Sequence, residues 1–206
     1  MVKNTIFAPL NFIEMDAALF EHIFTVIMLI ANIVTVFLAA RGSRWTWIFG
    51  VVTGVILCYN FFHDRLYLSF AFNVYSTIAS IVGVFSWKKK SEDNKRTICW
   101  GNPVWPLLVV AALTVSVYFF DANVLHSNLP FIDCLIPSLQ AVATFLMVRK
   151  DINAWVMYLI CNCIYIPLGL MSHQYKWLFI SACFLITATY GMVSFVKAWK
   201  QSKTNN

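Results

Sequence analysis

Charged residues are scarce in this chain of 206 residues. They make up 12% of it, whereas hydrophobic residues make up 60%, and the mean hydropathy is +0.72. So few charges cannot cover the surface of a soluble domain, and the composition predicts an integral membrane protein instead. The longest stretch between apolar segments, 88–101, is a charged loop and too short for a soluble catalytic domain.

Several functional motifs are also missing. The chain has no G-x-x-x-x-G-K-[ST] loop, so it has no visible site for ATP-driven pumping. Its His, Asp and Glu residues do not converge at a spacing suited to metal binding or acid–base catalysis. Cys161 and Cys163 would point to different sides of a helix, which favours packing over chelation. The sequence therefore predicts no enzyme activity, no cofactor and no metal site.

Long apolar segments dominate what is present. A helix needs about 20 apolar residues to span a bilayer, and we predict seven such spans at roughly 19–40, 45–62, 66–87, 103–121, 130–148, 154–172 and 177–196. The fold class is thus all-α integral membrane, in a single membrane domain over 1–206. The first span starts too late and runs too long for a cleaved signal peptide.

The basic residues are distributed by topology. Twelve of the 15 Lys and Arg residues follow spans one, three, five and seven. By the positive-inside rule, the amino terminus lies outside and the carboxyl terminus in the cytoplasm. The net charge of +6 is explained in this way, and we expect no nucleic-acid partner.

The chain also repeats itself. Shifting the first three spans by 108 residues aligns them with the last three without a gap, and the informative identities are Arg41 with Arg149, Trp47 with Trp155, Tyr67 with Tyr175 and Gly83 with Gly191. We predict two parallel repeats, at about 19–87 and 130–196, joined by a linker helix at about 103–121. Transporters built from repeats bind substrate near the bilayer midplane, between the repeats.

One helix face in the second repeat carries Trp155, Tyr158 and Asn162, at i, i+3 and i+7. With a rise of ~1.5 Å per residue, Asn162 lies about 10–12 Å below the basic end of its span. A polar group at that depth normally faces a bundle interior or a wet cavity. The first repeat has Gly50 and Gly54 where the second has Tyr158 and Asn162. This asymmetry suits an asymmetric ligand, although drift in a packed core gives the same pattern.

Other polar groups lie within the spans. Asn73 shares a face with two serines whose hydroxyls can bond to their own backbone, so only Asn73 demands an external partner. Asn32 and Gln140 align between the repeats, and we interpret them as helix-to-helix hydrogen bonds. Aromatic faces with a few amides and hydroxyls suit a flat ligand with a polar tail, and a cationic ring gains about 0.5–2 kcal/mol per cation–π contact. For any single aromatic residue, simple packing explains the position equally well.

The order of these pieces resembles the PnuC family of vitamin-precursor transporters. The resemblance rests on Arg41-Gly42-Ser43 before Phe49-Gly50, on Phe72-Asn73-Val-Tyr75, on Trp155-x-x-Tyr158-x-x-x-Asn162, and on seven spans in a three-plus-one-plus-three order. It implies a homotrimer in the bacterial inner membrane that carries nicotinamide riboside, with relatives for thiamine, riboflavin or deoxynucleosides. It also implies facilitated diffusion, with the substrate trapped inside by phosphorylation.

The resemblance implies a substrate site as well. The family motif Trp-x-x-Trp-x-x-x-Asn maps onto Trp155, Tyr158 and Asn162, with Tyr in place of the second Trp. Its Leu-Asn-x-Phe-Tyr motif maps onto Phe72, Asn73 and Tyr75 with one residue fewer, and Thr53 stands where a glutamine is expected. The expected substrate-binding residues are Trp47, Thr53, Asn73, Tyr75, Trp155, Tyr158 and Asn162. The alternative of another class is a membrane scaffold or sensor subunit whose aromatic residues only pack.

Overall fold

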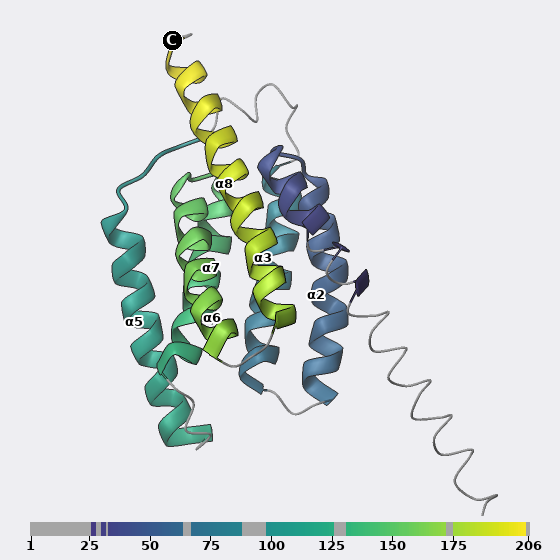
Figure 1. Ribbon diagram of the computed structural model, residues 1–206, viewed down its shortest axis with the longest axis vertical. Coiled ribbons are helices and arrows are strands. Elements are labelled where there is room, and N and C mark those ends of the chain that lie inside the picture. Colours follow the sequence, from purple (N-terminus) through teal and green to yellow (C-terminus); the bar gives the residue numbers. More distant parts are fainter. Residues whose placement is uncertain are drawn as a thin grey trace, which may run out of the picture.

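The computed structural model describes residues 26–27, 30–31, 33–63, 67–87, 98–125, 131–171 and 175–204. Residues 33–40 are helical, and the elements that follow are α2 (Trp45–His63), α3 (Tyr67–Ser86), α5 (Val104–Phe120), the π-helical turn η1 (Asp121–Leu125), α6 (Phe131–Val148), α7 (Asn153–Met171) and α8 (Tyr175–Thr204), as Figure 1 shows. Within these ranges the only β-type pairing is one isolated bridge between Cys99 and Asp151. The predicted all-helical class is confirmed.

The helices follow the predicted spans closely. The second to seventh spans correspond one to one to α2, α3, α5, α6, α7 and α8. Only α8 differs clearly, because it continues to Thr204, beyond the predicted end at 196, and extends past its neighbours in Figure 1. The first span is described only in part, and residues 19–25 and Asn32 lie outside the described residues.

In the part of the chain that the structure describes, two helical stretches are long and apolar enough to cross a membrane, Val104–Asn123 with mean hydropathy 1.8 and Ser181–Thr204 with 1.3. Four shorter apolar stretches lie in α2, α3, α6 and α7. Large apolar side chains cover the outside of the bundle; Phe85 is 69% exposed and Ile186 70%. A soluble protein rarely exposes apolar area on this scale, and a lipid surround accounts for it.

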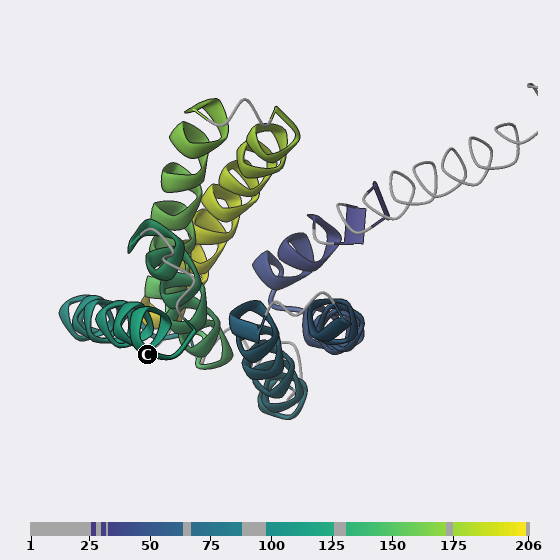
Figure 2. The ribbon, with the colours of Figure 1, turned by 90° about the horizontal axis from the view of Figure 1, so that it is seen from below.

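The helices form two pairs around a central helix. α2 packs on α3, α7 packs on α8, and α6 contacts α3, α7 and α5. Viewed along the bundle in Figure 2, the α2–α3 pair and the α7–α8 pair lie on different sides of α6, while α5 lies at the periphery. The inner faces of both pairs are therefore directed toward a shared interior.

The turns that lead into α2 and α7 have the same backbone structure, 108 residues apart. Each preceding helix ends at a residue in the left-handed conformation, Gly42 (φ 69°) and Lys150 (φ 57°). In both turns the amide of the left-handed residue donates to the carbonyl three residues earlier, and the amide of the next residue donates to the carbonyl five residues earlier. All of these backbone hydrogen bonds are 2.9–3.0 Å long. The next residue caps the new helix: Ser43 Oγ accepts from the Trp45 amide at 3.4 Å, and Asp151 Oδ1 accepts from the Asn153 amide at 3.0 Å.

The segment before α5 also makes hydrogen bonds with the second turn. The Cys99 amide donates to the Lys150 carbonyl at 3.3 Å, and Asn153 Nδ2 donates to the Gly101 carbonyl at 2.9 Å. Lys150 is only 7% exposed, with Nζ 5.6 Å from the centre of the Trp87 ring, and burial lowers the pKa of its ammonium. Burial raises the pKa of the Cys99 thiol, and the Asp151 carboxylate raises it further. These contacts fix the beginning of α7.

Candidate functional site

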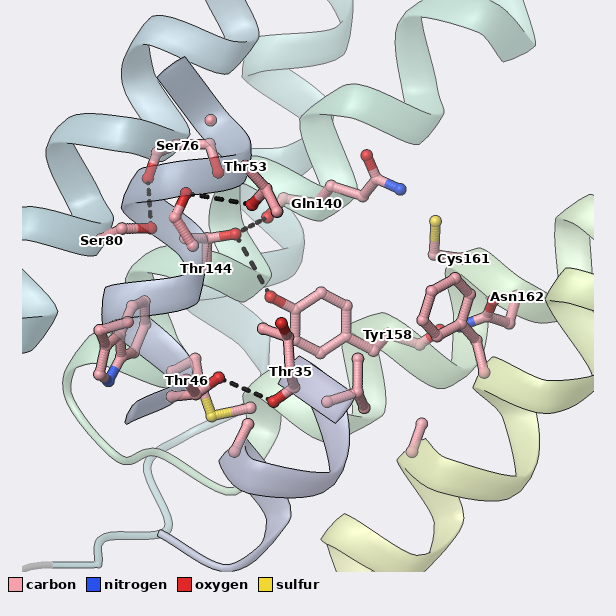
Figure 3. A pocket seen from close by; sticks show the side chains of 18 of the residues that line it. Thr35, Thr46, Thr53, Ser76, Ser80, Gln140, Thr144, Tyr158, Cys161 and Asn162 are labelled. Atoms are coloured by element: carbon pink, nitrogen blue, oxygen red, sulfur yellow. Dashed lines mark hydrogen bonds between the residues drawn. The ribbon is translucent and has the colours of Figure 1, made fainter. Parts of the chain in front are cut away.

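A cavity of about 350 Å³ lies in the interior between the helix pairs (Figure 3). Residues 35–39 and helices α2, α3, α6, α7 and α8 line it, and α5 does not. This volume is typical of a site for one small molecule. The cavity is therefore the candidate functional site.

The cavity wall follows the internal repeat. Ten pairs of lining residues are 108 positions apart: Val36 and Thr144, Ala39 and Met147, Trp47 and Trp155, Gly50 and Tyr158, Thr53 and Cys161, Gly54 and Asn162, Leu57 and Tyr165, Asn73 and Ser181, Ser76 and Phe184, and Ser80 and Ala188. The backbone positions are thus equivalent, while most of the side chains differ. The second half contributes Tyr158, Asn162 and Tyr165 where the first has two glycines and a leucine.

None of the described residues that line the cavity carries a formal charge. Its polar groups are the hydroxyls, amides and indoles of neutral side chains. An ionised group buried without a partner is strongly disfavoured. A ligand with a phosphate would find no cation here, whereas a neutral ligand, or a cation that can lie against aromatic rings, would be accommodated.

Trp47 and Trp155 occupy matching positions in the wall. Trp47 is 6% exposed and Trp155 1%. Each indole lies against a glycine of the paired helix, Trp47 on Gly83 and Trp155 on Gly191. Each also makes an edge-to-face contact with ring centroids 5.4 Å apart, Trp47 with Trp87 and Trp155 with Phe195. In the part of the chain that the structure describes, the two indole nitrogens are the only buried side-chain polar atoms without a hydrogen-bond partner.

A chain of hydroxyl groups connects α7 to α6. The Tyr158 hydroxyl lies 3.3 Å from Thr144 Oγ1, and Thr144 Oγ1 donates to the Gln140 carbonyl at 2.8 Å. Figure 3 shows the Tyr158 ring directed from α7 toward Thr144. The ring also lies 6.2 Å from that of Trp155, at 60° between planes. Two aromatic rings of α7 thus lie close together, and the contact with Thr144 of α6 fixes the position of the Tyr158 ring.

The amides come from two helices. Asn73 on α3 and Asn162 on α7 both line the cavity, each 9% exposed. Asn162 Nδ2 donates to the Tyr158 carbonyl, one turn earlier in the same helix, at 2.8 Å. This bond uses one of its two N–H groups and fixes the orientation of the amide.

The structure brings six of the seven expected site residues to this one cavity: Trp47, Thr53, Asn73, Trp155, Tyr158 and Asn162. Tyr75 is not among the lining residues. Its hydroxyl donates to the Ala141 carbonyl at 2.9 Å and joins α3 to α6. The Thr53 hydroxyl donates to the Phe49 carbonyl of its own helix at 2.9 Å, so its oxygen can only accept a hydrogen bond from a ligand.

Sequence reasoning missed several polar residues of the wall, namely Thr35, Thr46, Thr144 and Ser181. The sequence contains a clue for two of these residues. Ser181 is 108 residues after Asn73, and Thr144 is one turn after Gln140 on the same helix face. Gln140 was interpreted as a helix-to-helix contact. The structure places its side chain in the cavity wall.

A helical bundle with matched halves around a cavity with an uncharged lining has the architecture of a small-molecule transporter. Residues 22–201 match the family described as nicotinamide mononucleotide transporter, and the chain belongs to this family. The resemblance to PnuC inferred from the motifs is confirmed.

The curated relatives that are similar to the chain include the nicotinamide riboside transporters PnuC of Escherichia coli (strain K12) and of Shigella flexneri. Each is 23% identical, over 71% of this chain and 73% of the relative. Among solved structures, the crystal structure of the vitamin B3 transporter PnuC superposes with a TM-score of 0.64 at 22% identity, covering 97% of this chain and 94% of that one. The fold of the bundle is thus that of PnuC.

Proposed function

We propose that this protein is a multi-pass transporter of the bacterial inner membrane that carries nicotinamide riboside into the cell by facilitated diffusion, with phosphorylation trapping the substrate inside. The family and its transporter relatives support the general activity. The absence of a nucleotide-binding loop in the sequence supports passive movement.

The observation that carries the choice of substrate is the uncharged cavity wall. The family description names the mononucleotide, whereas the curated relatives are named for the riboside. The two molecules differ by a phosphate, which needs basic side chains or a helix amino terminus in a buried site. No Lys or Arg is present among the described lining residues. The wall therefore supports the riboside.

The aromatic residues suit the cationic pyridinium ring of the riboside. Trp155 and Tyr158 stack on the ring, each good cation–π contact contributing about 0.5–2 kcal/mol. Asn162 of α7 and Asn73 of α3, which both line the cavity, hydrogen-bond the ribose or the carboxamide. Thr53 and Trp47 complete the wall on α2. Tyr75 acts indirectly, through its bond to α6.

We further propose the three-plus-one-plus-three organisation with parallel repeats, the amino terminus outside and the carboxyl terminus inside. The matching turns at Gly42 and Lys150 and the ten paired wall positions support the repeat. The distribution of basic residues supports the orientation. By resemblance to its family, the protein assembles as a homotrimer.

The decisive experiment is a titration of the purified protein with nicotinamide riboside, nicotinamide mononucleotide and thiamine, followed by tryptophan fluorescence. Saturable quenching by the riboside alone is the expected result. Saturation by thiamine alone would reassign the substrate within the family, because thiamine also carries a cationic aromatic ring. Saturation by the mononucleotide would contradict the argument from the uncharged wall.

Uptake by variants of α7 tests the site itself. Asn162→Leu should abolish uptake while the protein remains in the membrane. Cys163→Leu is the matched control, because Cys163 is the next residue, lies on the exposed side of the same helix and does not line the cavity. Full uptake by Asn162→Leu would remove this amide from the site. If no ligand quenches the tryptophan fluorescence and the protein has a stable partner protein, the scaffold function is favoured instead.

A further inference from the structure

The hydroxyl chain across the cavity has a definite direction. A threonine hydroxyl has a single proton, and a carbonyl oxygen can only accept. Thr144 donates that proton to the Gln140 carbonyl at 2.8 Å. The 3.3 Å contact with Tyr158 must then run the other way, with the tyrosine hydroxyl as the donor. The hydrogen bonds therefore run from Tyr158 to Thr144 and from Thr144 to Gln140; Figure 3 shows the contact between Tyr158 and Thr144 as a dashed line.

This order changes what Tyr158 offers to a ligand. The phenolic group also has one proton, which it donates in the hydrogen bond to Thr144 Oγ1. The Tyr158 oxygen then has only lone pairs left for other partners, so in the cavity it is an acceptor. A ligand group opposite it must bring an N–H or O–H.

The equivalent place in the first half of the cavity has no such group. The positions 108 residues before Thr144 and Tyr158 are Val36 and Gly50, which have no side-chain hydroxyl. Both line the cavity, and the space beside Gly50 is taken up by Ser80, whose Oγ would lie 2.7 Å from an added Cβ. The first half has hydroxyl acceptors elsewhere in the wall, at Thr46, Thr53 and Ser80, which donate to backbone carbonyls. Only the second half has an acceptor at the position of the Tyr158 hydroxyl, and this difference can distinguish the two ends of an asymmetric ligand.

We propose that Thr144 is a specificity-determining residue that acts through Tyr158: by accepting the hydrogen bond of the phenolic O–H it leaves the Tyr158 oxygen as an acceptor in the cavity, which selects a ligand whose aromatic ring bears a hydrogen-bond donor, such as a carboxamide. The identity of the ring rests on the proposed function. The direction of the hydrogen bonds does not.

The test compares two ligands of equal charge and nearly equal shape, nicotinamide riboside and 3-acetylpyridine riboside. The second has a methyl group where the first has the NH₂ of its carboxamide, so it keeps the carbonyl acceptor and lacks the donor. Dissociation constants for both are measured on the purified full-length protein, by the quenching of tryptophan fluorescence. The wild type should bind the carboxamide more tightly.

Two variants should reduce this preference for opposite reasons. Thr144→Val keeps the shape of the side chain and removes the acceptor, which frees the phenolic proton to bond with the ketone. The ketone should then bind roughly two- to tenfold more tightly, the value of one hydrogen bond, with little change for the carboxamide. Tyr158→Phe removes the acceptor from the cavity, so the carboxamide should bind more weakly by a similar factor with little change for the ketone.

Two controls separate selectivity from stability. Thr144→Ser keeps the hydroxyl and should keep the wild-type preference. Thr114→Val removes a fully buried hydroxyl that also bonds one turn back, to the Val110 carbonyl at 2.8 Å, but lies on α5 away from the cavity. It should leave both dissociation constants unchanged.

The outcomes are distinct. Saturable binding by the wild type with the same preference in Thr144→Val and Tyr158→Phe overturns the role of Thr144 and leaves the proposed function intact. Equal weakening of both ligands by Thr144→Val also overturns it, because that is the mark of a merely structural residue. Failure of the wild type to bind either pyridine riboside contradicts the proposed function and the selection together.

Discussion

The indole of Trp155 lies directly on the backbone of Gly191. A Cβ added to this glycine would overlap the six-membered part of the indole, and the same holds for Gly83 and Trp47 in the first half. The glycines thus leave the space in which both tryptophans reach the cavity wall. Since Gly191 has no positive φ, the requirement comes from the close approach and not from the conformation of the backbone.

Gly191→Ala should therefore push the Trp155 ring out of its position. Overpacking of this kind costs about 1–3 kcal/mol of stability, and we expect a lower unfolding temperature together with weaker riboside binding. Thermal unfolding in detergent and the fluorescence titration measure the two effects. Thr189→Ala is the control on the same helix, because its side chain is exposed and its hydroxyl bonds only within α8. Wild-type behaviour of Gly191→Ala would show that the ring is not held by this contact.

The turn at Gly42 allows a cleaner measurement of backbone strain. Gly42 has φ 69°, and an added Cβ would meet nothing within 4 Å. Gly42→Ala should thus cost about 1–2 kcal/mol from conformation alone, as a decrease in the free energy of unfolding. Gly42→Asn should cost less, because asparagine tolerates the left-handed region better. Equal stability of the wild type and both variants would contradict the conformation of this turn.

Cys99 reports on the orientation of the chain. It is exposed, and it lies at the end of the bundle that the basic residues assign to the cytoplasm. In a protein with Cys58, Cys163 and Cys183 replaced by alanine, a membrane-impermeant maleimide should label Cys99 in inside-out vesicles and not in intact cells. The opposite result would invert the proposed topology while leaving the fold unaffected.

The same cysteine gives a pH dependence. Burial and the Asp151 carboxylate raise the pKa of the Cys99 thiol above its ordinary value of 9.0. The thiolate is the reactive form, so at a given pH below that value Cys99 has less thiolate than an ordinary thiol, and its labelling rate should continue to rise above pH 9.0. Asp151→Asn removes the negative charge, lowers the pKa and should accelerate labelling at fixed pH. An unchanged rate would show that the carboxylate does not influence the thiol.

Much of the fold could be predicted because the signals are long and periodic. A span of about 20 apolar residues leaves few alternatives, and the 108-residue repeat relates Trp47 to Trp155 before any coordinates are considered. The cavity residues Asn73 and Asn162 could be predicted for a related reason, since an amide in an apolar helix needs a partner.

The hydroxyl-bearing residues of the wall are harder to predict. Thr144 can satisfy its own hydroxyl one turn back, as Thr114 does on α5, so its sequence context does not reveal that it also meets Tyr158. Lys150 is another example. Its position after a span predicts a solvated cytoplasmic charge, but the left-handed turn places it under Trp87 with only 7% exposure. Both depend on how side chains of different helices pack against each other, which the local sequence does not show.

The uncharged wall makes a final prediction about salt. If no charged side chain contacts the ligand, its dissociation constant should depend little on ionic strength, since there is no ion pair to screen. We expect less than about a twofold change in riboside affinity between about 50 mM and about 500 mM salt. Thr53→Asp provides the contrast, because it introduces a carboxylate opposite a cationic ring. In that variant riboside affinity should rise at low salt and fall as salt is added. A strong salt dependence of the wild type would mean that a charged residue outside the described part of the chain reaches the ligand.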